Sequence, residues 1–124
     1  MKVEISIGEL VDKVTILSIK LKKFKNHKKK IHVKKEYEIL LQSMKKAGIN
    51  PESDEFKKLQ SINLSLWNIE DEIRKKELKN KFDSEFIELA RQIYFQNDKR
   101  AAAKKQIDLK YGSDLIEEKE YVNY

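Results

Sequence analysis

Only one proline and three glycines interrupt the 124 residues of this chain. These residue types end helices and form tight turns, so a chain with so few of them is too poor in turns for a β protein. Apolar residues recur every three or four positions over long segments, which predicts amphipathic helices. The length suits one core. We therefore expect an all-α fold in a single domain over residues 1–124.

Capping residues and periodicity give approximate bounds for five helices. Ser6 and Glu9 form a capping box at the start of the first, and Asn50 with Pro51 is expected to start the third. Asp83 is expected to cap the fourth. The expected segments run from Ser6 to about Lys25, then over 31–47, 51–79 and 83–111, and end in a short C-terminal helix over 114–121, capped by Ser113. Short connections predict an antiparallel helical bundle of four main helices plus this short one.

The third and fourth expected helices are unusually long. At about 28 residues each they would be rods of roughly 40 Å. Rods of that length often dimerise, because one small partner cannot cover them, so a homodimer is an expectation from length alone.

Composition narrows the class of protein. The chain has no cysteine, which leaves no disulfide framework and no thiolate metal site. No apolar run approaches the length of a membrane span, and the N-terminus lacks the apolar stretch of a signal peptide. We expect a cytoplasmic protein that makes no contact with a membrane.

Polar residues occupy the stripe of the fourth expected helix where its core face should lie. Ile93, Asn97, Arg100, Lys104 and Ile107 follow one another at helical spacing, yet only the two ends are apolar. The third helix repeats this pattern, with Asn63, Glu70, Arg74 and Glu77 between its apolar residues. Of 27 basic residues only three are Arg, and two of these, Arg74 and Arg100, lie in the polar stripes. A guanidinium retained in a Lys-rich chain suggests a need for its planar set of donors.

Burying a charge costs several kcal/mol unless the charge is paired and hydrogen-bonded. The stripes therefore have two explanations, a structural ion-pair network or a polar pocket between helices. The pocket hypothesis predicts a ligand with several anionic oxygens, such as phosphate, carboxylate or a nucleotide. Its candidate binding residues are Arg74, Arg100, Lys104, Lys20 and Asn97, with Glu70 and Glu9 orienting the bases or binding hydroxyls, and with Asp12, Glu77 and Tyr94 beside them. Tyr94 and Trp67 either stack on the ligand or pack in the core.

Two other functions stay open. Glu9, Asp12, Glu70 and Glu77 could hold Mg²⁺ in a nucleotide phosphohydrolase, although no cofactor is identified and no dedicated metal site is expected. Neither a phosphate-binding glycine loop nor a nucleophile motif is present, so enzyme and binding protein remain alternatives. The segment 20–35 holds nine Lys and no acid, which suits a solvated helical tip or contact with nucleic acid by a scaffold protein. His27 and His32 lie in this segment and are expected to be exposed.

Four stretches, "GELVDKVTIL", "LWNIEDEIR", "FIELARQIYFQNDKRAAAKKQI" and "SDLIEEKEY", resemble a family of short bacterial and phage proteins of unknown function. The resemblance implies a small helical protein, sometimes encoded near polysaccharide-synthesis genes. It brings no activity, substrate or catalytic residue. The stretches contain most of the polar candidate residues, among them Glu9, Asp12, Glu70, Arg74, Asn97, Arg100 and Lys104, together with Lys13, Asp98 and Glu118.

Overall fold

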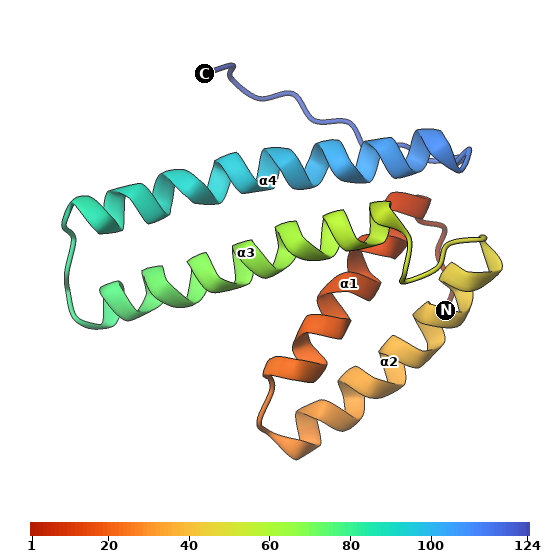
Figure 1. The fold of residues 1–124 in the computed structure, drawn as a ribbon, viewed down its shortest axis with the longest axis horizontal. Helices are drawn as coiled ribbons and strands as arrows, with labels where there is room; N and C mark the ends of the chain where they lie inside the picture. Colours follow the sequence, from red (N-terminus) through yellow and green to blue (C-terminus); the bar gives the residue numbers. More distant parts are fainter.

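The computed structural model describes residues 1–124 and contains four helices and no strand, which confirms the all-α prediction (Figure 1). The helices are α1 (Ile7–Lys23), α2 (His27–Lys46), α3 (Asp54–Leu78) and α4 (Ser84–Lys110). A side-chain cap starts each one, at Ser6, Asn26, Ser53 and Asp83. None of the four combines the length and the apolarity needed to cross a membrane.

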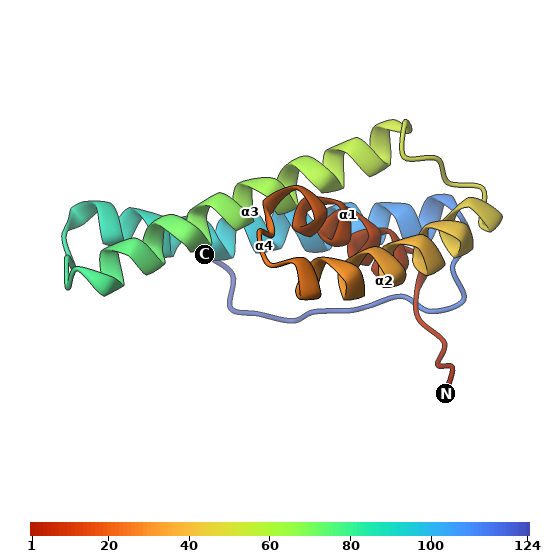
Figure 2. The same cartoon turned by 90° about the horizontal axis from the view of Figure 1, so that it is seen from below.

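The helices form two antiparallel hairpins, α1–α2 and α3–α4 (Figures 1 and 2). α1 packs against all three other helices, whereas α2 contacts α1 alone. The α3–α4 hairpin is the longer, and it extends well past the end of α1 (Figure 1). α1 is therefore the element that joins the two hairpins.

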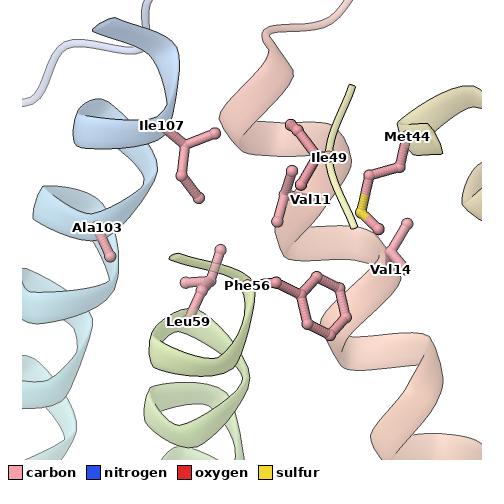
Figure 3. Packing of buried hydrophobic residues seen from close by; sticks show 8 residues of the cluster. All are labelled: Val11, Val14, Met44, Ile49, Phe56, Leu59, Ala103 and Ile107. Atoms are coloured by element: carbon pink, nitrogen blue, oxygen red, sulfur yellow. The ribbon is translucent and has the colours of Figure 1, made fainter. Parts of the chain in front are cut away.

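The hydrophobic core lies where the two hairpins meet. It combines two valines of α1 with side chains from the end of α2, the α2–α3 connection, the start of α3 and the end of α4 (Figure 3). The members are Val11, Val14, Met44, Ile49, Phe56, Leu59, Ala103 and Ile107. Between Trp67 and Ala102 no residue is fully buried. We call this stretch of α3 and α4, residues 67–102, the arm.

Two helix starts differ from the sequence prediction. α2 begins at His27, earlier than expected, because the Asn26 side chain accepts a hydrogen bond from the Lys29 amide at 3.1 Å. α3 begins at Asp54, so the prediction that Asn50 and Pro51 start it is wrong. The Asn50 carboxamide instead accepts from the Glu52 amide at 2.8 Å and forms a turn, and Ser53 provides the cap. Asn-Pro favours turns as well as helix starts, and here the turn prevails.

The expected fifth helix is not formed. Residues 114–124 are extended and run back along α4 (Figures 1 and 2); we call them the C-terminal strap. Ser113 does not cap a helix, because its hydroxyl donates to the Leu115 carbonyl at 2.7 Å and accepts from the Ile7 amide. Carboxylates of the strap form ion pairs with lysines of α4. A separate helix of eight residues is only marginally stable by itself, so these ion pairs favour the extended conformation.

Candidate functional site

The polar stripes of α3 and α4 first meet at the carboxylate of Asp12 on α1. Asp12 is 1 % exposed, and Arg100 holds both of its oxygens, through Nε at 2.9 Å and Nη2 at 2.5 Å. Asn63 donates to the same carboxylate at 2.9 Å and to the Thr15 hydroxyl at 2.8 Å. The hydrogen bond to Asp12 raises the pKa of Arg100 above its ordinary value. This part of the stripes is a structural network that fastens α1 to α3 and α4.

Lys104, one turn beyond Arg100, belongs to a second set of ion pairs. Its ammonium lies 2.6 Å from a Glu9 oxygen and 2.9 Å from a Glu117 oxygen on the C-terminal strap. Burial lowers the pKa of Lys104, but the hydrogen bonds to Glu9 and Glu117 outweigh burial and leave the pKa raised. Lys104 therefore holds α1 and the strap to α4.

The N-terminal end of α1 is held by residues from the far end of α4. The Gly8 amide donates to the Asp108 carboxylate at 2.6 Å, and the Ile7 amide donates to the Ser113 hydroxyl at 3.0 Å. A Cβ added at Gly8 would lie 2.4 Å from the Lys104 carbonyl oxygen, so only glycine allows this approach. The sequence analysis predicted neither the hydrogen bond of Asp108 nor the close packing at Gly8. The position of Asp108 within the apolar face of α4 is the sequence feature that indicates its role.

Beyond Asp12 the stripes border an open cleft of about 500 Å³ between α1, α3 and α4. Arg74 and Arg100 both line it, together with Asn97 and Glu70 of the predicted set. The full lining is Ile16, Ile19, Asn63, Leu66, Trp67, Glu70, Asp71, Arg74, Asn97 and Arg100. The ring of Trp67 also packs on Phe24, with 6.2 Å between ring centres. The two arginines of the polar stripes thus line one cavity, which lies between α1 and the arm.

The ion pairs at this cleft differ in strength. Arg74 lies 3.4 Å from Glu70, and its side chain is 77 % exposed, so solvent screens the pair. Arg100 is held firmly by Asp12 below the cleft. The lining carries two guanidinium groups and two carboxylates, from Glu70 and Asp71, and is charge-balanced.

A comparison with known protein families covers the whole chain. A family model described as "Family of unknown function (DUF6165)" matches residues 1–124. The chain belongs to the DUF6165 family. No curated protein and no solved structure matches this DUF6165 chain.

Several candidate residues of the DUF6165 chain lie outside the cleft. Glu9 and Lys104 form an ion pair with each other outside the cleft. Lys20 and Glu77 are also absent from the lining of the cleft. Tyr94 lies on another side of α4, where its ring packs against Phe95 and Tyr124 of the strap at 4.8 and 5.3 Å. There it borders a second cleft of about 700 Å³ between α4 and the strap.

The four acids considered for Mg²⁺ are not brought together in the DUF6165 chain. Glu9 faces Lys104, Asp12 faces Arg100 and Glu70 faces Arg74, while Glu77 is exposed near the end of α3. No group of three or more His, Cys, Asp or Glu side chains has the arrangement of a metal site. The cleft instead offers guanidinium and amide donors, carboxylate acceptors and one indole wall.

Proposed function

We propose that this protein binds a small molecule carrying a phosphate or carboxylate in the cleft between α1, α3 and α4. The observation behind the proposal is that Arg74 and Arg100, from two different helices, line one cavity of about 500 Å³ together with Asn97. Pockets between the helices of a bundle are common ligand sites, and guanidinium groups bind oxyanions through paired hydrogen bonds. Lys104 and Lys20 drop out of the proposed anion site.

Both arginines have donors to spare. Arg100 uses Nε and one Nη2 hydrogen on Asp12, which leaves three of the five N–H groups of a guanidinium. Arg74 is paired only with Glu70, at 3.4 Å and in solvent. An exposed pair of this kind contributes about 0–1 kcal/mol, so a ligand anion can replace Glu70 at little cost.

The charge balance of the cleft limits the ligand further. Two carboxylates, Glu70 and Asp71, stand among the two guanidinium groups, and a polyanion would be repelled by them. The same carboxylates are good acceptors for hydroxyl groups, and Trp67 offers a flat wall for a ring. A ligand with a single phosphate or carboxylate group, hydroxyls and a ring, such as a nucleoside monophosphate, fits this set better than a polyphosphate.

Trp67 provides the test, because it is the only tryptophan of the chain and lines the cleft. We would titrate the protein with adenosine monophosphate, adenosine and inorganic phosphate and follow Trp67 fluorescence and the heat of binding. The expected result is saturable binding of adenosine monophosphate, weaker binding of phosphate and little of adenosine. No heat and no fluorescence change with any of the three would overturn the choice of ligand class.

Two arginine variants localise the binding. Arg74→Gln should weaken it about tenfold or more, since a hydrogen bond to a charged group contributes about 1.5–3 kcal/mol. Arg91→Gln is the matched control, because Arg91 lies on the same arm, pairs with Glu88 at 3.5 Å and does not line the cleft. Glu70→Gln should strengthen binding, because it removes the competing carboxylate. Equal losses in the Arg74 and Arg91 variants would place the ligand elsewhere.

Sequestration without turnover and Mg²⁺-dependent hydrolysis of a nucleotide stay alternatives within this proposal. The calorimetric titration repeated with Mg²⁺ separates them, because the first predicts metal-independent binding with no product. The bacterial or phage origin and the neighbourhood of polysaccharide-synthesis genes, which the sequence resemblance implies, are the expected setting.

A further inference from the structure

The tip of the α1–α2 hairpin carries a strongly basic segment. Residues 20–35, which we call the basic tip, form the end of α1, the connection and the start of α2 (Figure 1). They contain nine Lys and no Asp or Glu. Seven of these lysines are exposed, and Lys20 and Lys30 are half-buried. In the proposed function this surface has no part.

None of the nine lysines of the basic tip has a carboxylate partner. No ion pair of the structure involves a residue between Lys20 and Lys35. Eight lysines outside the tip do have a carboxylate within 4.0 Å, namely Lys13, Lys57, Lys75, Lys76, Lys104, Lys105, Lys110 and Lys119. The positive charge of the tip is thus uncompensated within the chain.

This charge also opposes the start of α2. The first turns of α1, α3 and α4 carry acidic residues, such as Glu9, Glu55 and Glu85, which favour the positive end of the helix dipole. The first turn of α2 has no acid and carries Lys28, Lys29 and Lys30 instead. Lysines there cost free energy in the isolated chain, and a bound polyanion would remove that cost.

We propose that the basic tip binds the phosphate backbone of a nucleic acid, without reading its sequence. Lysines 28, 29 and 30 are consecutive on a helix, so they point to three sides about 100° apart. A narrow tip with lysines on several sides suits a groove between two phosphate strands better than a flat membrane, which only one side could touch.

The tip lacks the groups that other modes of binding need. A surface-bound membrane helix requires a broad apolar face, whereas the exposed apolar residue of the tip is Ile31 alone. Sequence-specific recognition relies on Arg, Asn or Gln at base edges or on stacked aromatic rings. The tip contains no Arg or Gln, and its one Asn, Asn26, uses its side-chain oxygen to cap α2. Its one Phe, Tyr or Trp residue, Phe24, packs on Trp67. The residues of the tip therefore favour contacts between lysine side chains and the phosphates of a nucleic acid.

The test is fluorescence anisotropy with a labelled DNA duplex of arbitrary sequence, measured over a range of salt concentrations. The expected dissociation constant is about 10⁻⁴ to 10⁻⁶ M near physiological salt, tighter at low salt. In the tip variant, Lys25, Lys28 and Lys29 are replaced by Gln. All three are exposed, so the fold should be kept. The slope of log K against log salt should become shallower by up to about 2.7, or about 0.9 for each lost phosphate contact.

A control variant with the same net charge separates the tip from overall basicity. It carries Gln at Lys79, Lys81 and Lys99, three exposed lysines near or on the arm that have no ion pair. Tenfold or greater loss of affinity in the tip variant, with less than twofold loss in the control, supports the proposal. Equal losses, or no binding of the unaltered protein at low salt, would overturn it. Binding to phosphatidylserine vesicles but not to DNA would also overturn it and assign the tip to a membrane surface.

Discussion

The guanidinium of Arg100 on α4 binds both carboxylate oxygens of Asp12 on α1, and the two residues are 88 positions apart in the chain. Asp12 is 1 % exposed, so this pair lies at the centre of the contact between the two hairpins. It also places the remaining donors of Arg100 at the edge of the cleft. One arginine thus connects the stability of the fold with the candidate site.

Replacement of Arg100 should destabilise the fold strongly. Arg100→Gln leaves the buried Asp12 carboxylate without its charged partner, and the expected loss in the free energy of unfolding is about 3–5 kcal/mol. Urea denaturation measures it. Arg74→Gln is the control, with an expected loss of less than about 1 kcal/mol because its pair with Glu70 is exposed. The double variant Asp12→Asn, Arg100→Gln should be more stable than Arg100→Gln alone; a further loss would contradict the role given to Asp12.

Gly8→Ala should also be destabilising, by about 2 kcal/mol or more. The new methyl group would meet the Lys104 carbonyl oxygen at 2.4 Å, and a backbone atom inside a packed helix cannot easily move away. Thermal or urea unfolding is the measurement. Gly48→Ala is a useful comparison, since at φ +86° it suffers backbone strain of about 1 kcal/mol but no contact. A Gly8 variant as stable as the Gly48 variant would show that α1 can shift on α4 freely.

Acid should release the C-terminal strap from α4. The hydrogen bond from Lys104 holds the pKa of Glu117 below its ordinary value of 4.5. The group therefore contributes stability above pH 4.5, and this contribution is lost as the pH falls through the lowered pKa of the folded state. We expect Glu117→Gln to be less stable than the unaltered protein at neutral pH, by about 0.5–1 kcal/mol. The difference should vanish in acid; a difference that persists there would have another cause.

The arm should be the least protected part of the helices in hydrogen exchange. Over most of the arm no third helix packs against α3 and α4 (Figure 1), and no residue is buried from Trp67 to Ala102. Its amides should exchange faster than those of residues 11–17 in α1, which lie in the core. Repeating the measurement at tenfold higher protein concentration tests the expected homodimer. Contact between arms would raise protection of residues 67–102 with concentration, whereas a monomer would show no change.

Periodicity predicted the inward-facing residues only in part: Asn63 and Lys104 are buried, whereas Arg74 and Glu77 are exposed. It did not predict which partners these residues meet. The polar stripes of α3 and α4 were visible in the sequence, and Arg74, Arg100, Asn97 and Glu70 do border one cleft. Lys104, one turn from Arg100, instead meets Glu9 and Glu117. That outcome depends on how α1 crosses α4 and on the close approach at Gly8, which no spacing within one helix encodes. The polar stripes contribute both to buried ion pairs and to an open cleft beside them.

The C-terminal strap shows how tertiary contacts override local propensity. The segment "DLIEEKEY" is rich in good helix formers and follows Ser113, a typical cap, so a helix was a reasonable prediction. Its carboxylates pair instead with Lys104 and Lys105 of α4, from an extended backbone. A segment this short gains little from helix formation, because nucleation is costly. A few ion pairs suffice to decide its conformation.

The hydrogen bonds at the start of α1 have a consequence for synthesis on the ribosome. The amides of Ile7 and Gly8 find their side-chain partners at Ser113 and Asp108, more than 90 positions later. These contacts cannot form until residues 108–113 have emerged from the exit tunnel. The packing of α1 is therefore completed only when the end of α4 is available. Until then its valines Val11 and Val14 have only α2 and α3 to cover them.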